Sequence, residues 1–445
     1  MLAFKIIFGI FLILSYIAMM TAMIIFERDK PRNIILWSLL FLFTQLIGYA
    51  IYLVARKVFF MKRTSLETKK KEDEIYTNLI SSQITDGTQT DDELFAFSSL
   101  AFDAKVRENN TYEFINKYEN VKKKLIKDMK SAKSYIIFEL TKMNFEYCQE
   151  IVDMMISKAN EGVVVKFVHD RLIDRKIIKK LKKNGVKVYR FSKYNTIGRV
   201  YSSIRNQIVI DGNIAYLGNL FVKNREVAGK YVVSDMFMRL SGDIVRDIDI
   251  NTHKDVIFAS GKFIDYTAPE ATEISEKAQM QFISNQIETD IELMIIKAIC
   301  SAKKSIQLQL EEFIPTESIM SLLKFAINSN IDVRLMVPLK TNKHSKYFAS
   351  RAYAKELALT GANVYLFDGF IRFNSIVIDN NYVFYGSYVL DREHISVGPQ
   401  NMLIIKDNKA IDFANKMFND GVNNSYRISN AKYMLTREKF FKNFV

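Results

Sequence analysis

The sequence predicts an α/β protein in which an N-terminal two-helix transmembrane hairpin precedes two tandem lobes of alternating strands and helices. Three observations predict this: two long uncharged segments lie near the N-terminus, strands alternate with amphipathic helices over most of the remaining chain of 445 residues, and one segment occurs twice. Alternating strands and helices are typical of a mostly parallel sheet covered on both faces. We expect the hairpin at 1–60, a basic juxtamembrane segment and linker at 61–110, lobes at 111–260 and 261–430, and a basic, aromatic tail at 431–445.

The two uncharged segments, 6–26 and 33–55, are each long enough to cross the hydrocarbon core as a helix. A short hydrophilic connector at 27–32 follows the first segment, where a signal peptide would carry a small-residue cleavage site. Lysine and arginine are frequent just after the second segment, so the positive-inside rule predicts that the lobes are cytoplasmic. These basic residues either contact anionic headgroups or are a plain stop-transfer flank.

The composition limits the partners and cofactors. A formal charge of +14 favours an anionic partner, either nucleic acid or an acidic membrane surface. Cys148 and Cys300 are the two cysteines, and their spacing argues against a disulfide framework or a zinc site. The chain has no P-loop, dinucleotide-binding glycine pattern, HExxH motif or nucleophile elbow. We therefore expect neither a cofactor nor a metal.

Hydrophobic periodicity predicts the elements of the first lobe. The segment 84–93 is polar, acidic and without period, which is typical of a linker or an exposed loop. Beyond it the pattern predicts helices at 121–132, 148–159 and 175–183, and strands at 135–140, 163–168 and 186–191. Glycines at 162 and 185 end the second and third helices.

The repeated segment follows these elements. RNQIVIDGNIAYLG at 205–218 recurs as FNSIVIDNNYVFYG at 373–386. Each copy predicts a β-hairpin, because two apolar runs flank an Asp-Gly or Asn-Asn turn whose residues tolerate positive φ. In the second half, strands are expected at 332–337 and 361–367 and a helix after Thr316, so the whole unit is duplicated. Residues 243–288 are expected to bridge the lobes.

At this point the chain resembles the phospholipase D superfamily, and specifically its bacterial cardiolipin synthases. The resemblance runs from about residue 25 to about residue 425 and includes the segments 313–318 and 349–353. It implies two lobes about a pseudo-twofold axis, an active site between them, and a location in a bacterial plasma membrane. Family members join phosphatidylglycerol or related phospholipids through a phosphohistidine intermediate and release glycerol.

The family motif is His-x-Lys-x4-Asp, once in each lobe, and this chain departs from it. The aspartates remain as Asp211 and Asp379, which we interpret as supporting residues. Isoleucine and asparagine replace the first histidine and lysine, and arginine and asparagine replace the second pair: Ile204, Asn206, Arg372 and Asn374. Isoleucine cannot form a phosphoenzyme, and arginine is a poor nucleophile although it holds phosphate well. The family also usually has asparagine where this chain has Val389.

We therefore predict no catalytic residues and a membrane-anchored pseudoenzyme that binds anionic phospholipid or regulates phospholipid synthesis. The candidate contacts with phosphate are Arg205, Asn206, Arg372, Asn374 and Ser387. For Arg372 an ordinary salt bridge is an equal alternative. The expected partners are the anionic membrane and either a catalytically competent synthase or another membrane protein.

Two alternatives to this function stay open. The chain could be an active cardiolipin synthase that uses other residues or a partner subunit, or it could be a scaffold for a membrane protein. A nucleic-acid role is not expected, because the lysine-rich helix at 175–183 is explained by a solvated face. The tail at 431–445 is either an amphipathic segment on the bilayer or a short helix that closes the second lobe.

Overall fold

The computed structural model describes most of the chain after residue 87. The described residues are 16–17, 20–21, 37–41, 47–48, 50–54, 87–88, 90–143, 145–191, 203–218, 232–262, 266, 278–285, 290–340, 344–391, 399–428 and 442. The chain forms two compact units, a small one within Met1–Glu72 and a large one that contains both lobes.

In the small unit, the described residues of the two apolar segments are helical. Phe41 and Tyr52 are buried there, with Tyr16, Met20 and Trp37 packed against them. The ring centroids of Trp37 and Tyr52 lie 5.1 Å apart in an edge-to-face arrangement. Among the residues that the structure describes, no helix has both the length and the apolar character that crossing a bilayer requires. Most of 6–26 and 33–55 lies outside the described residues, so the transmembrane hairpin stays a prediction.

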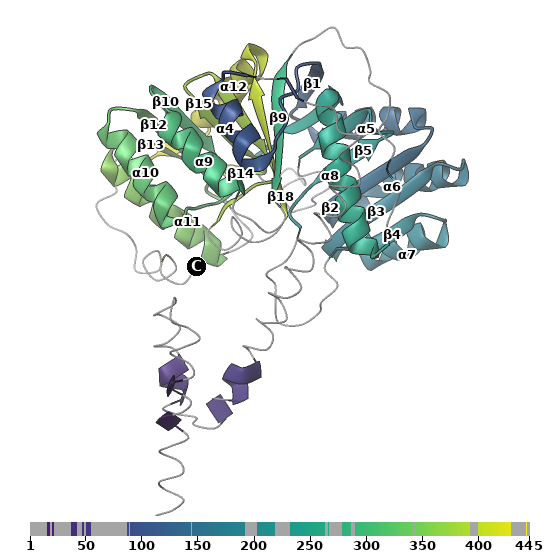
Figure 1. Ribbon diagram of the computed structural model, residues 1–445, viewed down its shortest axis with the longest axis horizontal. Coiled ribbons are helices and arrows are strands. Elements are labelled where there is room, and N and C mark those ends of the chain that lie inside the picture. The colour runs from purple at the N-terminus through teal and green to yellow at the C-terminus, as the bar shows by residue number, and fades with distance from the viewer. Residues whose placement is uncertain are drawn as a thin grey trace, which may run out of the picture. The chain divides into compact units, whose positions relative to one another are not determined.

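The first lobe is a seven-stranded sheet in the order β1-β8-β6-β5-β2-β3-β4 (Figure 1). Its strands are β1 (Asn110–Ile115), β2 (Tyr135–Met143), β3 (Val164–Ile173), β4 (Lys187–Arg190), β5 (Gln207–Ile210), β6 (Ile214–Leu217) and β8 (Phe237–Gly242). Its helices are α5 (Tyr118–Ser131), α6 (Phe145–Asn160), α7 (Arg175–Lys183) and α8 (Asp243–Ser260). The first three helices share one core face of the sheet, and α8 packs on the other.

The second lobe has an eight-stranded sheet in the order β9-β18-β16-β15-β10-β12-β13-β19. Its strands are β9 (Gln279–Asn285), β10 (Ser305–Gln309), β12 (Asp332–Pro338), β13 (Asn363–Phe367), β15 (Asn374–Ile378), β16 (Tyr382–Gly386), β18 (Gln400–Lys406) and β19 (Ser425–Arg427). Its helices are α9 (Asp290–Ser301), α10 (Glu317–Asn328), α11 (His344–Thr360) and α12 (Asn408–Asn423). The first seven strands repeat the order of the first lobe, so the prediction of two sheet-containing lobes is confirmed, and β19 is an addition at the edge.

The sheets are more antiparallel than the sequence suggested. In the first lobe, β2, β3 and β4 pair in parallel, as expected for strands joined by helices. The strands β5, β6, β8 and β1 pair antiparallel, and a tight hairpin turn joins the first two of them. The turns have positive φ at Asp211–Gly212 and at Asp379–Asn380. The second turn therefore lies one residue earlier than the expected Asn-Asn pair.

The region assigned to a linker contains a helix. Residues Glu93–Phe102 form α4, whose N-terminal N–H groups donate to the Asp92 carboxylate. Leu94 and Phe95 are buried in the core of the second lobe. The acidic composition of 84–93 concealed this start, because Asp92 is the N-cap of an apolar helix rather than part of a solvated loop.

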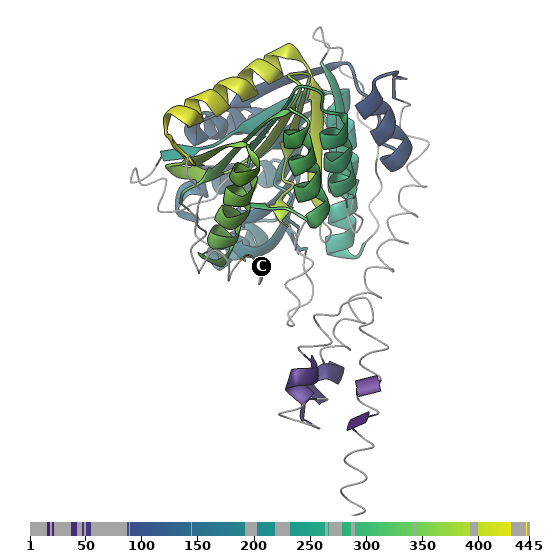
Figure 2. The same cartoon turned by 90° about the vertical axis from the view of Figure 1, so that its left-hand side faces the viewer.

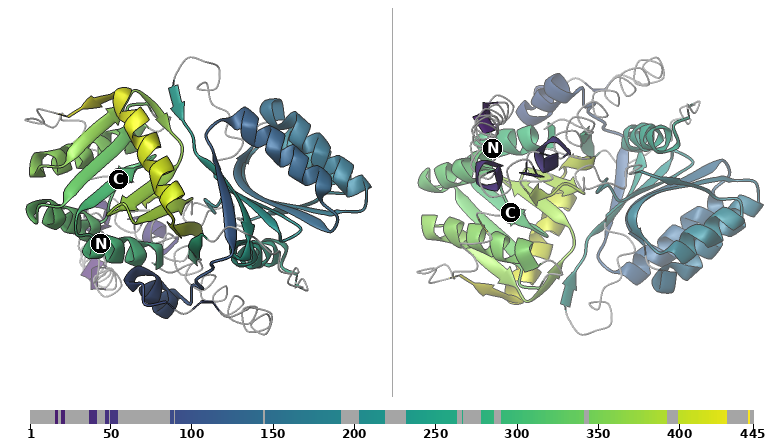
Figure 3. Two further views of the ribbon diagram at one scale, coloured as in Figure 1. Left: turned by 90° about the horizontal axis from the view of Figure 1, so that it is seen from above. Right: turned by 90° about the horizontal axis from the view of Figure 1, so that it is seen from below.

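The two lobes, which lie side by side in Figure 3 and one in front of the other in Figure 2, share a core between their sheets. The Phe114 and Phe413 rings stack with centroids 4.5 Å apart. The Tyr385 hydroxyl donates to the Met236 carbonyl oxygen at 2.6 Å. A short strand from the first half, β7 (Val232–Ser234), pairs in parallel with β14 (Gly369–Ile371) from the second. A further parallel pair joins β11 (Phe313–Ile314) and β17 (Leu390–Asp391) within the second half.

Candidate functional site at the seam between the lobes

The two positions where the family motif has histidine lie where the lobes meet, which we call the seam. The Ile204 backbone N–H donates to the Pro399 carbonyl oxygen at 3.2 Å, just before β18 of the second lobe. The Arg372 backbone N–H donates to the Ser234 carbonyl oxygen at 3.1 Å, at the end of β7. Each position is thus held by backbone from the other half of the chain. These two backbone hydrogen bonds place both histidine positions of the motif at the seam.

The motif aspartates lie at the other end of their hairpins and hold backbone. The Asp211 carboxylate accepts three hydrogen bonds of 2.8 Å from the N–H groups of residues 133–135, between α5 and β2. The Asp379 carboxylate accepts three of 2.7–2.8 Å from residues 303–305, between α9 and β10. These two aspartate clamps fasten each hairpin to the loop that starts the neighbouring strand. In this geometry the carboxylates face protein N–H groups.

The asparagines at the lysine positions also hold backbone. Asn206 Oδ1 accepts from the Thr141 N–H at 3.1 Å and from its hydroxyl at 2.9 Å. Asn374 Oδ1 accepts from the Glu311 N–H at 2.9 Å, and Nδ2 donates to the Tyr388 carbonyl oxygen at 2.6 Å. Both side chains are buried. We call these contacts the asparagine braces, because each ties the start of the motif strand to the end of the strand beside it.

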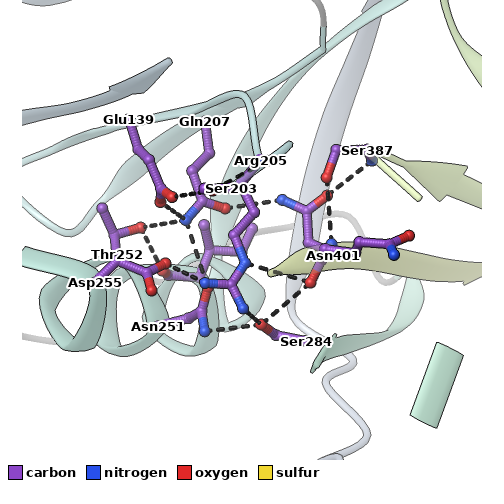
Figure 4. Close-up of polar contacts among 12 residues, drawn as sticks. Glu139, Ser203, Arg205, Gln207, Asn251, Thr252, Asp255, Ser284, Ser387 and Asn401 are labelled. Atoms are coloured by element: carbon purple, nitrogen blue, oxygen red, sulfur yellow. Dashed lines mark hydrogen bonds and ion pairs between the residues drawn. The ribbon is translucent and has the colours of Figure 1, made fainter. Parts of the chain in front are cut away.

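Arg205 takes part in an ion pair inside the protein. Its side chain is completely buried and pairs with the equally buried Asp255 on α8. Nε donates to the Gln400 carbonyl oxygen at 3.3 Å, and Nη2 donates to the Ser284 hydroxyl (Figure 4). The guanidinium thus links the first lobe to β9 and β18. We remove Arg205 from the candidate phosphate contacts, because burial and this pairing use the group that would bind phosphate.

A second carboxyl group completes this buried network. Glu139 on β2 accepts from the Ser203 hydroxyl at 2.7 Å and from Gln207 Nε2 at 2.9 Å. Gln207 Oε1 accepts from Asn401 Nδ2 at 2.9 Å, across the seam (Figure 4). Burial and then the charge of Asp255 raise the pKa of Glu139 well above its usual value. The burial of Glu139 beside a second carboxyl group is thus compensated by hydrogen bonds from Ser203 and Gln207.

Arg372 and Ser387 lie at the second-lobe side of the seam. Arg372 is largely buried, with 7 % of its surface exposed, and burial lowers its pKa to about 10, so it is charged at neutral pH. The Ser387 hydroxyl accepts from the Asn401 N–H at 3.2 Å, and the Ser387 N–H donates to Asn401 Oδ1 at 2.9 Å. Of the five candidate contacts, Arg205 and Arg372 are cationic, and Arg372 occupies a position where the family motif has histidine.

A carboxyl group with an altered pKa also lies at the seam. Asp235 follows directly after Ser234, whose carbonyl oxygen holds Arg372. Burial and then the charge of Glu311 raise the pKa of Asp235 to about 7. One buried Asp235 oxygen, Oδ1, accepts no hydrogen bond within the described part of the chain. A group that titrates near neutral pH in such a place is a candidate acid or base.

The two histidines whose side chains are described lie apart from the histidine positions of the motif. His169 on β3 is buried and stacks against Phe167, with ring centroids 5.8 Å apart. Its strand is two places from β5 in the sheet, about 10 Å at the usual strand spacing. His253 on α8 lies beside Tyr135, at the clamp end of the hairpin. The side chain of His344 and all of His394 lie outside the described residues.

Sequence reasoning missed Glu139, Asp255 and Asp235. Glu139 could have been found, because it is the one charged residue within the apolar strand 135–140. A charge at a buried strand position needs a partner, which indicates a polar network. Asp255 and Asp235 carry no such local pattern. Their partners lie more than 40 residues away, so only the fold brings them together.

The comparisons with known proteins agree with this architecture. The family model described as "Cardiolipin synthase, PLD-like domain" matches residues 295–421, in the second lobe. A probable cardiolipin synthase, YwiE, of Bacillus subtilis is 24% identical over 442 residues, which cover 95% of this chain and 88% of that protein. A cardiolipin synthase of Oceanobacillus iheyensis is 26% identical, covering 84% of each chain.

A relative with higher identity covers less of the chain. A cardiolipin synthase of Halalkalibacterium halodurans is 32% identical over 55% of this chain and 52% of its own length. Among solved structures, a phosphatidylserine synthase of Haemophilus influenzae has a TM-score of 0.58 at 12% identity, covering 75% of this chain and 92% of that one. At that identity the likeness concerns the fold alone.

The second lobe matches the PLD-like domain of cardiolipin synthases, and relatives that cover most of the chain bear the name cardiolipin synthase. Compared with the family motif, this chain keeps the two aspartates in equivalent geometry, while no histidine or lysine occupies the other four motif positions. The scaffold of the site is thus present in both lobes.

Proposed function

We propose that this protein is a membrane-anchored cardiolipin synthase-like protein that is catalytically silent and binds anionic phospholipid at the seam. The observation that carries the proposal is the pair Ile204 and Arg372, which lie at the seam in place of both histidines. A phosphoenzyme requires a nucleophile, and proton transfer to the leaving oxygen requires a titratable group. An isoleucine supplies neither, and an arginine with a pKa of about 10 stays protonated at neutral pH.

Arg372 is the residue to which we assign phosphate binding. A guanidinium presents a planar set of donors that matches phosphate oxygens, and its charge is retained at neutral pH. Asn206 and Asn374 are withdrawn from this role, because the asparagine braces use their side chains. Ser387 remains a neighbouring hydroxyl. The anchor is the predicted hairpin within 1–60, with the lobes on the cytoplasmic side of a bacterial plasma membrane, and a competent synthase is the proposed protein partner.

Binding is tested on the full chain reconstituted in nanodiscs. The dissociation constant for a fluorescent phosphatidylglycerol analogue is measured for wild type, for Arg372→Met and for Arg334→Met. Arg334 is a matched control, because it lies on β12 of the same lobe and pairs with Asp332. We expect weaker binding, by about tenfold, for Arg372→Met alone, since a hydrogen bond to a charged group contributes about 1.5 kcal/mol. Equal binding by the three proteins would refute the role of Arg372.

Catalytic silence is tested by a lipid-synthesis assay with phosphatidylglycerol. The wild type is compared with Ile204→His/Arg372→His and with the fourfold variant that also carries Asn206→Lys and Asn374→Lys. The histidine-only variant is needed because both lysine substitutions break the asparagine braces. Turnover by wild type would refute the silent reading. Turnover that begins only with the restored groups would support an intact seam that lacks its reactive side chains.

A second candidate function is an active phosphatidyltransferase that uses other residues, and Asp235 is the observation that favours it. With a pKa near 7, this carboxyl group exchanges a proton at neutral pH and could activate an attacking hydroxyl directly. This reading predicts turnover by wild type that is lost in Asp235→Asn. Turnover that survives this substitution would exclude Asp235 as the base.

A further inference from the structure

A strongly basic surface lies on α7 and β4 of the first lobe, away from the seam. Helix α7 buries Ile177 and Leu181 against the lobe and contains six basic residues and no acidic one. The two elements contact each other at one edge of the lobe (Figure 1). Apart from Arg190 at the end of β4, the exposed cations on them are Arg175, Lys176, Lys179, Lys182, Lys183 and Lys187. We call these six residues the α7–β4 surface.

These six side chains lack counter-charges within the described part of the chain. Each is exposed, and none has an ion pair or a side-chain hydrogen bond there. The two acidic residues near the helix are already used, since Asp153 pairs with Lys180 and Asp174 caps α7. Like charges meet instead: burial and then the charge of Lys187 lower the pKa of Lys166 on β3. A concentration of unneutralised positive charge produces an attractive field for an anionic partner.

The second lobe has a different surface at the equivalent place. There β13 is covered by the added strand β19, whereas β4 ends its sheet. The helix before β13 is α11, and its Glu356 pairs with Lys324 and with Lys442. Lys346 on the same helix pairs with Glu312, so α11 makes ion pairs that the six cations of the first lobe lack. The α7–β4 surface is therefore a property of one lobe rather than of the repeated fold.

We propose that the α7–β4 surface docks on an anionic membrane surface. The chain carries two uncharged segments, 6–26 and 33–55, of bilayer-spanning length. An anchor of that kind would keep the lobe at a high effective concentration near headgroups, so even weak attraction per lysine would be enough to bind. Nucleic acid would have to bind the surface from solution, without the high effective concentration that the anchor gives to the headgroups. The proposal concerns a surface separate from the seam, so it does not depend on lipid binding there, although it rests on the membrane anchor of the proposed function.

The test measures how fast individual lysines react with an acetylating reagent. The full chain is placed in nanodiscs of phosphatidylcholine alone or with about a third phosphatidylglycerol, and mass spectrometry follows each lysine. We expect the five lysines of the surface to react roughly fivefold more slowly in the anionic discs. The matched controls are Lys123, Lys127 and Lys130 on α5, which are also exposed and without an ion pair. Their rates should be similar in both discs.

Two further arms complete the test. Raising the salt to about 1 M, where the Debye length is about 3 Å, should restore the labelling of the surface. In Lys179→Gln/Lys182→Gln/Lys183→Gln, Lys176 and Lys187 should lose their protection, whereas Lys123→Gln/Lys127→Gln/Lys130→Gln should leave it unchanged. Glutamine preserves helix propensity, and thermal unfolding checks the fold.

Three results would overturn the proposal. The first is equal labelling of the surface in the two discs. The second is equal protection of the α5 lysines, which would indicate a general charge effect. The third is stronger protection by double-stranded DNA, added to phosphatidylcholine discs, than by phosphatidylglycerol, which would assign the surface to nucleic acid.

Discussion

The two lobes share their supporting residues and differ in the chemistry of the seam. Both aspartate clamps make three hydrogen bonds of 2.7–2.8 Å to an equivalent loop, and both asparagine braces hold the equivalent strand end. At the next positions the copies diverge. The first lobe has the buried Arg205, where the second has Phe373 in an apolar core. On neighbouring strands within each sheet, Glu139 lies opposite Gln207 in the first lobe, and Gln309 lies opposite Ser375 in the second.

This difference separates two kinds of constraint. Residues that hold the backbone are alike in both copies, because each hairpin needs the same hydrogen bonds to attach to its neighbouring loop and strand. Residues at the seam differ between the copies, which is compatible with the proposed loss of the reaction. The first lobe then has an ionic contact with its neighbour, and the second lobe has an apolar one. The following substitutions test whether equivalent residues in the two lobes contribute differently to the free energy of unfolding.

The largest effect is expected at the seam of the first lobe. Arg205→Met leaves Asp255 buried without its partner, which costs about 3–5 kcal/mol in the free energy of unfolding. The counterpart Phe373→Leu keeps an apolar side chain and should cost less than about 1.5 kcal/mol. Chemical denaturation measures both. The double variant Arg205→Met/Asp255→Leu should recover part of the loss, and a double variant as unstable as the single one would contradict the ion-pair explanation.

The next effect should be equal in the two lobes. Asp211→Asn and Asp379→Asn each keep a residue that tolerates positive φ but remove one acceptor oxygen and the charge. Each should cost about 1.5–3 kcal/mol, since hydrogen bonds to charged groups contribute that much. The two values should agree within about 0.5 kcal/mol, the usual error of additivity between distant sites. A difference of several kcal/mol would show that one clamp carries a role beyond its loop.

How far the sequence predicts this molecule depends on the range of the interaction. The helix at 175–183 and the strand and turn residues of both hairpins follow from local periodicity and φ preference, and they are found close to where they were expected. The helix α4 was missed because its cap resembles a polar linker. The fate of Arg205 was also missed, since its partners Asp255, Ser284 and Gln400 lie on three distant elements. Comparison with the His-x-Lys-x4-Asp motif locates the positions where the family has its reactive residues. Only the packing of the folded chain shows which charged side chains are already paired within the protein.

A smaller effect tests the asparagine braces. Asn206→Ala and Asn374→Ala each remove buried hydrogen bonds to backbone and should each cost about 1–3 kcal/mol, because the partner groups are left unsatisfied. Matched substitutions to Asp keep the acceptor oxygen and indicate how much of the loss belongs to the Oδ1 contact. If Ala at either position leaves the unfolding midpoint unchanged, the brace is not a structural contact and a ligand role returns for that asparagine.

The last test concerns a pH dependence that the two copies do not share. The pKa of Asp235 is 3.8 in an unfolded chain and about 7 in the folded one, so folding takes up a proton between these values. The contribution of this group is therefore fully present below about pH 4 and is lost as the pH rises through about 7. Burial raises the pKa of Glu139 as well, which adds a dependence of the same sign.

Asp235→Asn and Glu139→Gln remove these two contributions separately. For each variant, the free energy of unfolding minus that of wild type should rise with pH, because the wild type alone loses stability as its carboxyl group ionises. For Asp235→Asn the rise should begin near pH 4 and level off above pH 7. The second lobe has Gln400 and Gln309 at the corresponding strand positions, so it carries neither titration. A difference that is flat or falls with pH would show that burial in the folded seam does not raise the pKa of these carboxyl groups.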